Sequence, residues 1–127
     1  MHHSRLSTVL IDCDPEHFER GVEFWRHALG KELIPLDDRY ASLRGRVGGD
    51  GGVIVMLQRV PAAERAVHLD IETDDIEAEV RRLERLGARR KATFEHWVVM
   101  EAPSGHAFCV VPARREDFPA KAARWEA

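Results

Sequence analysis

Two stretches with the same pattern of residues decide the fold. They read RLSTVLIDCDPEHFERGVEFWRHALG at residues 5–30 and AVHLDIETDDIEAEVRRLERLG at residues 66–87. Each begins with a short run of apolar, partly β-branched residues, which is typical of a strand. Each continues with apolar residues at helical spacing and ends on a glycine, Gly30 or Gly87, that stops a helix. The apolar stripes are Phe18, Val22, Trp25 and Leu29 in the first stretch and Ile76, Val80 and Leu83 in the second.

Three further strands are predicted after each helix. They cover residues 32–36, 40–45 and 53–59 in the first half and 89–94, 96–101 and 106–112 in the second. The order strand, helix, three strands therefore occurs twice, which predicts an α+β fold of two βαβββ modules. A single helix covers only one face of a small sheet, so we expect the two modules to pair.

One domain is expected to span residues 1–127. Module one covers residues 5–60 and module two covers residues 66–112, with a joint near 61–65. The tail at 113–127 carries Phe118, Ala122 and Trp125 at helical spacing, which predicts a docked helix. At the other end, His2 and His3 are expected in a loose terminus.

Composition excludes several classes of protein. With 44% hydrophobic and 32% charged residues, the chain has the balance of a folded globular domain. A net charge of −3 argues against a nucleic-acid partner. No apolar run approaches the roughly 18 residues of a membrane helix, and the start lacks a secretory signal. We therefore expect a cytoplasmic protein without membrane partners, in which Cys13 and Cys109 stay reduced.

Local motifs resemble those of the vicinal oxygen chelate superfamily, which includes glyoxalase I, bleomycin-resistance proteins and extradiol dioxygenases. The matching segments, in order, are Asp14-Pro15, Phe24-Trp25, Leu29-Gly30, Val67-His68-Leu69, Asp74-Asp75-Ile76 and Ala102-Pro103-Ser104-Gly105-His106. The branch that the chain resembles most is that of small bacterial glyoxalase-like domains. The resemblance implies curled mixed sheets around a central cavity, a small-molecule ligand or substrate, and a homodimer.

Enzymes of that superfamily bind a divalent metal through four side chains, and the resemblance assigns the four positions here to Ser7, Met56, His68 and Cys109. Only His68 is a good ligand for Mg²⁺, Ni²⁺ or Zn²⁺, which prefer nitrogen and oxygen donors. Gln58 is a substitute only if its strand shifts. We therefore expect no standard metal centre, no cofactor, and weak or absent binding of Ni²⁺, Zn²⁺ and Mn²⁺.

Alternation along the strands predicts which residues line the cavity. If Val67, Leu69 and Ile71 pack on the helices, His68 and Asp70 face the cavity as a candidate acid/base pair. The alternative is a hydrogen-bonded histidine in a polar pocket, without a role in proton transfer. By the same alternation Ser7 and Val9 line the cavity together with Met56 and Gln58, whereas Thr8 and Leu10 pack on the helices.

Two classes of function stay open. The first is an enzyme, a lyase, isomerase or related catalyst that uses His68, with Asp70 or Glu72, without a standard metal centre. The second is a metal-free protein that sequesters a hydrophobic or aromatic compound, as antibiotic-resistance relatives do. Trp97 is a candidate wall residue for such a ligand.

Overall fold

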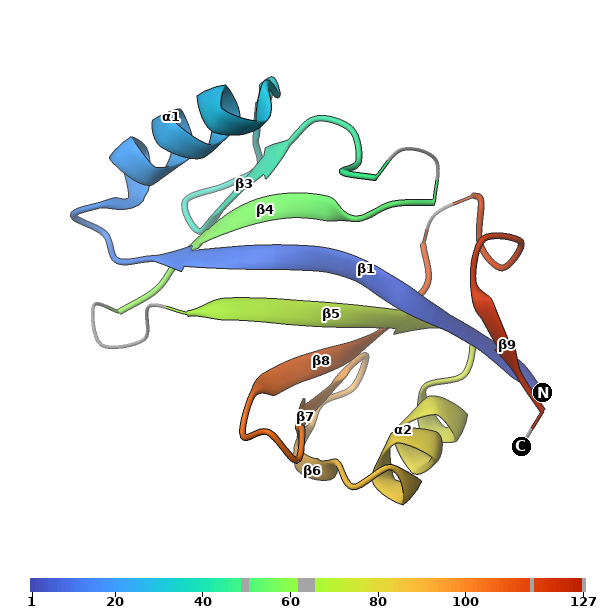
Figure 1. Ribbon diagram of the computed structural model, residues 1–127. Coiled ribbons are helices and arrows are strands. Elements are labelled where there is room, and N and C mark those ends of the chain that lie inside the picture. Colours follow the sequence, from blue (N-terminus) through green and yellow to red (C-terminus); the bar gives the residue numbers. More distant parts are fainter. Residues whose placement is uncertain (49–50, 62–65, 115, 127) are drawn as a thin grey trace. The chain divides into compact units, whose positions relative to one another are not determined.

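The computed structural model describes residues 1–48, 51–61, 66–114 and 116–126 (Figure 1). The chain divides into two compact units. The α1 unit is Thr8–His68, and the α2 unit combines Met1–Ser7 with Leu69–Ala127. Strand β1 (His2–Cys13) begins in the α2 unit and ends in the α1 unit. Most of the predicted joint at 61–65 lies outside the described residues.

The α1 unit has a sheet in the order β2, β3, β4, β1 with one helix against it. Strands β2 (Leu33–Pro35), β3 (Tyr40–Leu43) and β4 (Ile54–Arg59) are antiparallel to one another. Strand β4 is parallel to β1, with Leu10 opposite Met56 and Asp12 opposite Gln58. Helix α1 (Phe18–Leu29) ends at Gly30, whose φ of 65° is the left-handed conformation that glycine adopts without strain.

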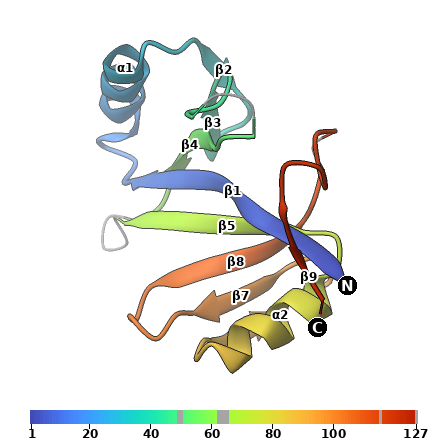
Figure 2. The ribbon, with the colours of Figure 1, turned by 45° about the vertical axis from the view of Figure 1, so that its right-hand side comes forward.

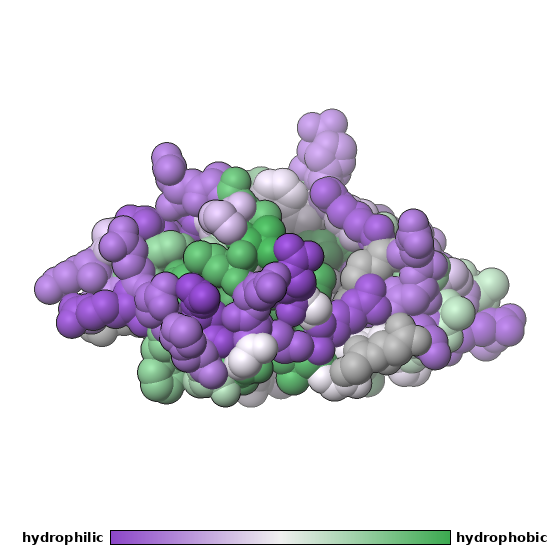
Figure 3. Space-filling model, turned by 90° about the horizontal axis from the view of Figure 1, so that it is seen from above, coloured by the Kyte–Doolittle hydropathy of each residue, from purple (hydrophilic) through white to green (hydrophobic). Residues whose placement is uncertain are grey.

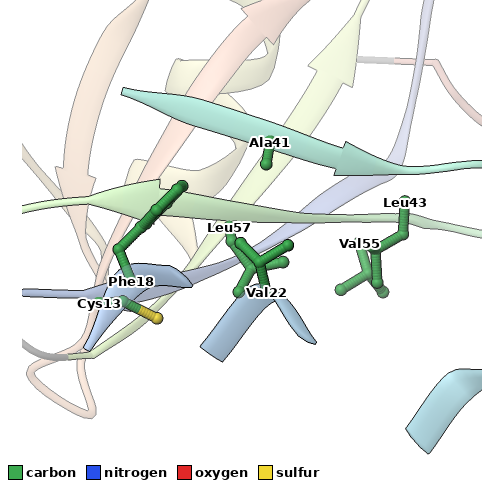
Figure 4. Close-up of a cluster of buried hydrophobic side chains, with 7 residues drawn as sticks. All are labelled: Cys13, Phe18, Val22, Ala41, Leu43, Val55 and Leu57. Carbon is green, nitrogen blue, oxygen red and sulfur yellow. The ribbon is translucent and has the colours of Figure 1, made fainter. Parts of the chain in front are cut away.

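The core of the α1 unit lies between α1 and the sheet. Figure 4 shows Phe18 and Val22 of the helix beside Leu57 and Val55 of β4. Leu57 is fully buried, and removing one such side chain from water contributes about 2 kcal/mol. Hydrophilic side chains cover much of the surface seen in Figure 3, with apolar ones between them. The apolar residues predicted along the first helix, Phe18 and Val22, thus pack on the predicted strand.

The α2 unit repeats this arrangement. Strand β5 (Val67–Thr73) begins in the α1 unit and continues in the α2 unit, where it is parallel to β8 (Ala107–Pro112). Strands β7 (Val98–Glu101) and β6 (Arg89–Thr93) follow β8 in the sheet, and each is antiparallel to its neighbour. Helix α2 (Ile76–Arg85) begins at Asp75, whose carboxylate accepts a hydrogen bond from the Ala78 N–H. The core of this unit consists of Val80, Leu83, Val98, Met100 and Val110.

The chain ends pair with each other, which corrects two predictions. The tail forms strand β9 (Ala123–Trp125) instead of a docked helix, and β9 runs antiparallel to the start of β1 (Figure 2). His2 and His3 lie in β1 opposite Trp125 and Arg124, so the start is not loose. The unpaired edge of β1 gives the tail backbone hydrogen bonds, which outweigh its weak helical pattern.

The fold is α+β, with the predicted order of strand, helix and three strands in both units. The predicted module boundaries and the cavity between the modules stay predictions. Within the described residues, no helix combines the length and apolar character of a membrane-spanning segment.

Candidate functional site

A histidine and a buried carboxylate meet in the α1 unit. Nδ1 of His68, on β5, lies 2.8 Å from Oδ2 of Asp12, near the end of β1. This is ion-pair distance, although the two groups are not aligned as a hydrogen bond. The Asp12 side chain is fully buried, whereas the His68 side chain is 39% exposed. The pair therefore joins a shielded charge to an accessible imidazole.

Gln58 and Arg39 extend this pair into a row of side chains. The Gln58 amide satisfies its neighbours when its nitrogen faces Asp12 and its oxygen faces Arg39. The nitrogen then donates to Oδ1 of Asp12 at 3.1 Å, and the oxygen accepts from Nε and Nη2 of Arg39, each at 2.9 Å. The amide atom on the Arg39 side also lies 3.3 Å from the Tyr40 hydroxyl. Arg39, Gln58, Asp12 and His68 thus follow one another in contact.

The Asp12 carboxylate determines what His68 can do. A carboxylate beside Nδ1 favours the tautomer with the proton on Nδ1, which leaves a lone pair on Nε2. The Nε2 side of the ring is free of that contact, because the contact with Asp12 is made by Nδ1. This combination is what a general base requires.

Two apolar side chains, the buried Leu10 and the half-buried Met56, lie near Asp12 and Gln58 on the same strands. Leu10 and Met56 are opposite each other in the register of β1 and β4, two residues before Asp12 and Gln58 on their strands. Residues two apart on a strand share a face, so all four side chains lie on the face away from α1. An apolar surface with a few polar groups is the usual composition of small-molecule sites.

The side chains of β4 that face α1 are the ones that alternation predicted. On β1 the side chains that face α1 are the opposite set. Met56 and Gln58 alternate with the core residues Val55 and Leu57, as expected. On β1, however, Ile11 and Cys13 pack against the core. Val9 shares their face, so its predicted position opposite the helix is wrong. Leu10 and Thr8 take the other face instead of packing on the helix.

The remaining candidate residues lie in the α2 unit. Ile71 packs on the core as expected, but Leu69 is 40% exposed, and so is not covered by a helix. Asp70 is opposite Cys109 in the register of β5 and β8. Burial, together with the charge of Asp70, raises the pKa of the Cys109 thiol to about 11. Asp70 as partner of His68 stays a prediction.

Two further candidates have defined surroundings. Ser7 is 8% exposed on β1. Trp97 stacks on Phe94, with ring centroids 4.7 Å apart and an interplanar angle of 16°, and it remains 40% exposed. An exposed stacked pair is suited to packing against another flat apolar group, but the predicted role of Trp97 in ligand binding stays a prediction.

The donor set does not fit the metal that the resemblance implies. Over the described part of the chain, no three His, Cys, Asp or Glu side chains gather around one point. Of the four assigned positions, Met56 is a thioether and Cys109 is a thiol whose raised pKa keeps it protonated at neutral pH.

Sequence reasoning missed Asp12 and Arg39. Asp12 is a carboxylate that directly follows the apolar run Val9-Leu10-Ile11, and a carboxylate there is expensive to bury without partners. That cost is a usable signal, because it predicts that Asp12 has polar neighbours. Arg39 carries no such signal, since an exposed arginine in a turn is ordinary.

Comparisons with known proteins agree with this architecture. The sequence profile of the glyoxalase-like domain family matches residues 8–111. No curated protein matches the sequence.

Solved structures share the fold at low identity. An NAD-dependent benzaldehyde dehydrogenase from Legionella pneumophila is similar with a TM-score of 0.60 at 12% identity, over 84% of this chain and 98% of that one. An Mn(II)-bound glyoxalase from Novosphingobium aromaticivorans has a TM-score of 0.62 at 17% identity, over 91% of this chain and 43% of that one.

A glyoxalase/bleomycin resistance protein/dioxygenase superfamily member from Vibrio splendidus 12B01 has a TM-score of 0.55 at 18% identity, over 87% of this chain and 99% of that one. The family profile covers most of the chain, and both units have the strand order that the resemblance implies. The chain belongs to the glyoxalase-like domain family, within the vicinal oxygen chelate superfamily.

Proposed function

We propose that this glyoxalase-like protein is a lyase or isomerase in which His68 acts as the base, without a standard metal centre. The observation that carries the proposal is the contact of His68 with the fully buried carboxylate of Asp12. Nε2 of His68 takes a proton from a carbon next to a carbonyl group, and the electron pair of that C–H bond moves into an enolate. Return of the proton to a neighbouring atom completes an isomerisation, and departure of a leaving group completes a lyase reaction.

His68 is the catalytic residue in this scheme, and Asp12 is a positioning residue. Asp70 lies two residues beyond His68 on β5 and keeps its proposed role as the partner of His68 in an acid/base pair. Support for a small carbonyl substrate comes from the family, because one structural neighbour is a glyoxalase. Methylglyoxal–thiol adducts are therefore the first substrates to test.

The chain offers a matched control for the test. His17 contacts Asp14 at 2.7 Å, as His68 contacts Asp12, but His17 lies just before α1. Deuterium uptake by each adduct in D2O, followed by NMR, reports proton abstraction. We expect His68→Ala to lower the rate at least about 100-fold and His17→Ala to leave it unchanged. An unchanged rate in folded His68→Ala contradicts the proposal.

The alternative is a sequestering protein, and the apolar pair Leu10 and Met56 favours it. In that case small aromatic compounds raise the melting temperature without turnover. Met56→Ala should then weaken binding as much as His68→Ala does, because both remove part of the contact surface. Under the enzyme proposal, His68→Ala abolishes proton exchange and Met56→Ala only weakens it.

We also propose a cytoplasmic homodimer that binds neither nucleic acid nor membranes. The cysteines Cys13 and Cys109 are free thiols, which suits a reducing compartment. Val67 and Leu69 are 56% and 40% exposed on β5, and a second copy of the chain would cover them.

A further inference from the structure

The guanidinium of Arg39 has a neutral hydrogen-bond acceptor in the described structure. Its Nε and Nη2 both face one neutral atom, the amide oxygen of Gln58. Among the residues that the structure describes, no carboxylate lies within ion-pair distance of this guanidinium. The carboxylate nearest in sequence, Asp37, accepts hydrogen bonds from the backbone N–H groups of Arg39 and Tyr40, each at 2.8 Å, and so fixes the turn.

The position of Arg39 connects this charge to the base. Gln58 separates Arg39 from Asp12, and Asp12 contacts His68. Arg39 and His68 therefore stand at the two ends of one row of side chains. Arg39 is an exposed residue, and its guanidinium lies 5.7 Å from the centroid of the Tyr40 ring. The aromatic ring restricts the guanidinium while leaving it accessible.

A guanidinium binds a carboxylate more strongly than a neutral amide. The planar fork of arginine matches the two oxygens of a carboxylate, and charge-assisted hydrogen bonds are roughly twice as strong as neutral ones. An incoming carboxylate can replace Gln58 at the fork or use the remaining Nη1. The charges balance, because the positive guanidinium of Arg39 offsets the negative charge of the carboxylate.

Resting on the proposed function, we propose that Arg39 binds the carboxylate of the substrate, and that the site takes small 2-oxo or related carboxylic acids. The apolar remainder of such a molecule would contact the half-buried Met56, which shares the face of Gln58. A single guanidinium suits one carboxylate better than a phosphate, which usually has several donors.

The test compares two probes of one shape, 2-oxo-4-phenylbutanoate and its primary amide. Calorimetric titration should show the carboxylate binding about 10- to 100-fold more tightly than the amide, and only the carboxylate should weaken with added NaCl. Arg39→Gln should remove this preference, and Arg39→Lys should keep part of it. Arg44→Gln is the matched control, because Arg44 is exposed and pairs with Glu32.

Equal binding of both probes, no binding of the carboxylate, or an unchanged preference in folded Arg39→Gln overturns the inference. Deuterium uptake at C3 of the carboxylate probe tests the base separately. We expect His68→Asn to keep the carboxylate preference and to lose the exchange. If the wild type shows the Arg39-dependent preference without exchange, the role of His68 as base fails and the carboxylate site stands.

Discussion

His17 and His68 each contact a buried aspartate, Asp14 and Asp12 respectively. The two pairs differ in what surrounds the aspartate. Asp14, the partner of His17, also accepts a hydrogen bond from the His17 backbone N–H at 3.0 Å. That contact fixes the turn before α1. Asp12 instead belongs to a row that includes Gln58 and Arg39. The same residue pair therefore has a structural role in one place and a candidate chemical role in the other.

Asp12→Asn tests the positioning role. An amide next to Nδ1 no longer selects the tautomer with the proton on Nδ1, so the rate of proton exchange should fall about 100-fold while substrate affinity changes little. The measurement is the rate of deuterium uptake at saturating and subsaturating substrate. A change confined to affinity, with an unaltered saturated rate, contradicts the positioning role.

Glu79 predicts how stability responds to acid. Burial alone would raise its pKa, but hydrogen bonds from Arg82, His2 and Ser4 outweigh burial and lower the pKa below the ordinary 4.5. This stabilisation is present above the unfolded-state pKa and is lost as pH falls through the lowered folded-state pKa. We expect melting temperature to decline below about pH 4.5, and Glu79→Gln to flatten that decline while lowering stability at neutral pH. The exposed Glu16→Gln should leave the wild-type curve unchanged.

Elements with strong periodicity were predictable, and elements fixed by pairing were not. Val22 of α1 and Val80 of α2 are core residues at the expected helical spacing. The face of β1 was not predictable, because Leu10 and Ile11 are both apolar and either could face the helix. Likewise Gln58 was a predicted site residue, but its link to Arg39 depends on the antiparallel pairing of β3 and β4. Tertiary pairing supplies information that local patterns lack.

Besides the backbone pairing with β1, one side chain of β9 makes two defined contacts. Nε1 of Trp125 donates to Oγ of Ser4 at 2.9 Å, and the Arg82 guanidinium lies 3.8 Å from the centroid of the indole ring. Trp125→Ala should lower the free energy of unfolding by about 1–3 kcal/mol in urea titrations. Hydrogen exchange should rise at residues 2–4 and 123–125. The neighbouring Arg124→Ala is the control, since Arg124 is 60% exposed and should change stability little.

At the scale of the whole molecule, the proposed homodimer depends on an apolar surface of β5. A charged residue at Leu69 would have to lose its hydration at the interface. Leu69→Glu should therefore shift sedimentation at micromolar concentration from twice the chain mass of 14.5 kDa to the chain mass itself. A wild type that sediments as a monomer contradicts the dimer, and Leu86→Glu, at a residue 66% exposed after α2, serves as control.

Strand β9 pairs with the start of β1, so two segments that are far apart in the sequence are neighbours in the sheet. His2 lies opposite Trp125, so a short peptide linker could join the two ends of the chain into a hairpin. New ends could then be opened between Asp37 and Asp38, which lie exposed between β2 and β3. Such a circular permutant keeps every strand pair described above. In the permutant, β9 and the start of β1 would follow each other in the chain, so their long-range pairing would become a local hairpin.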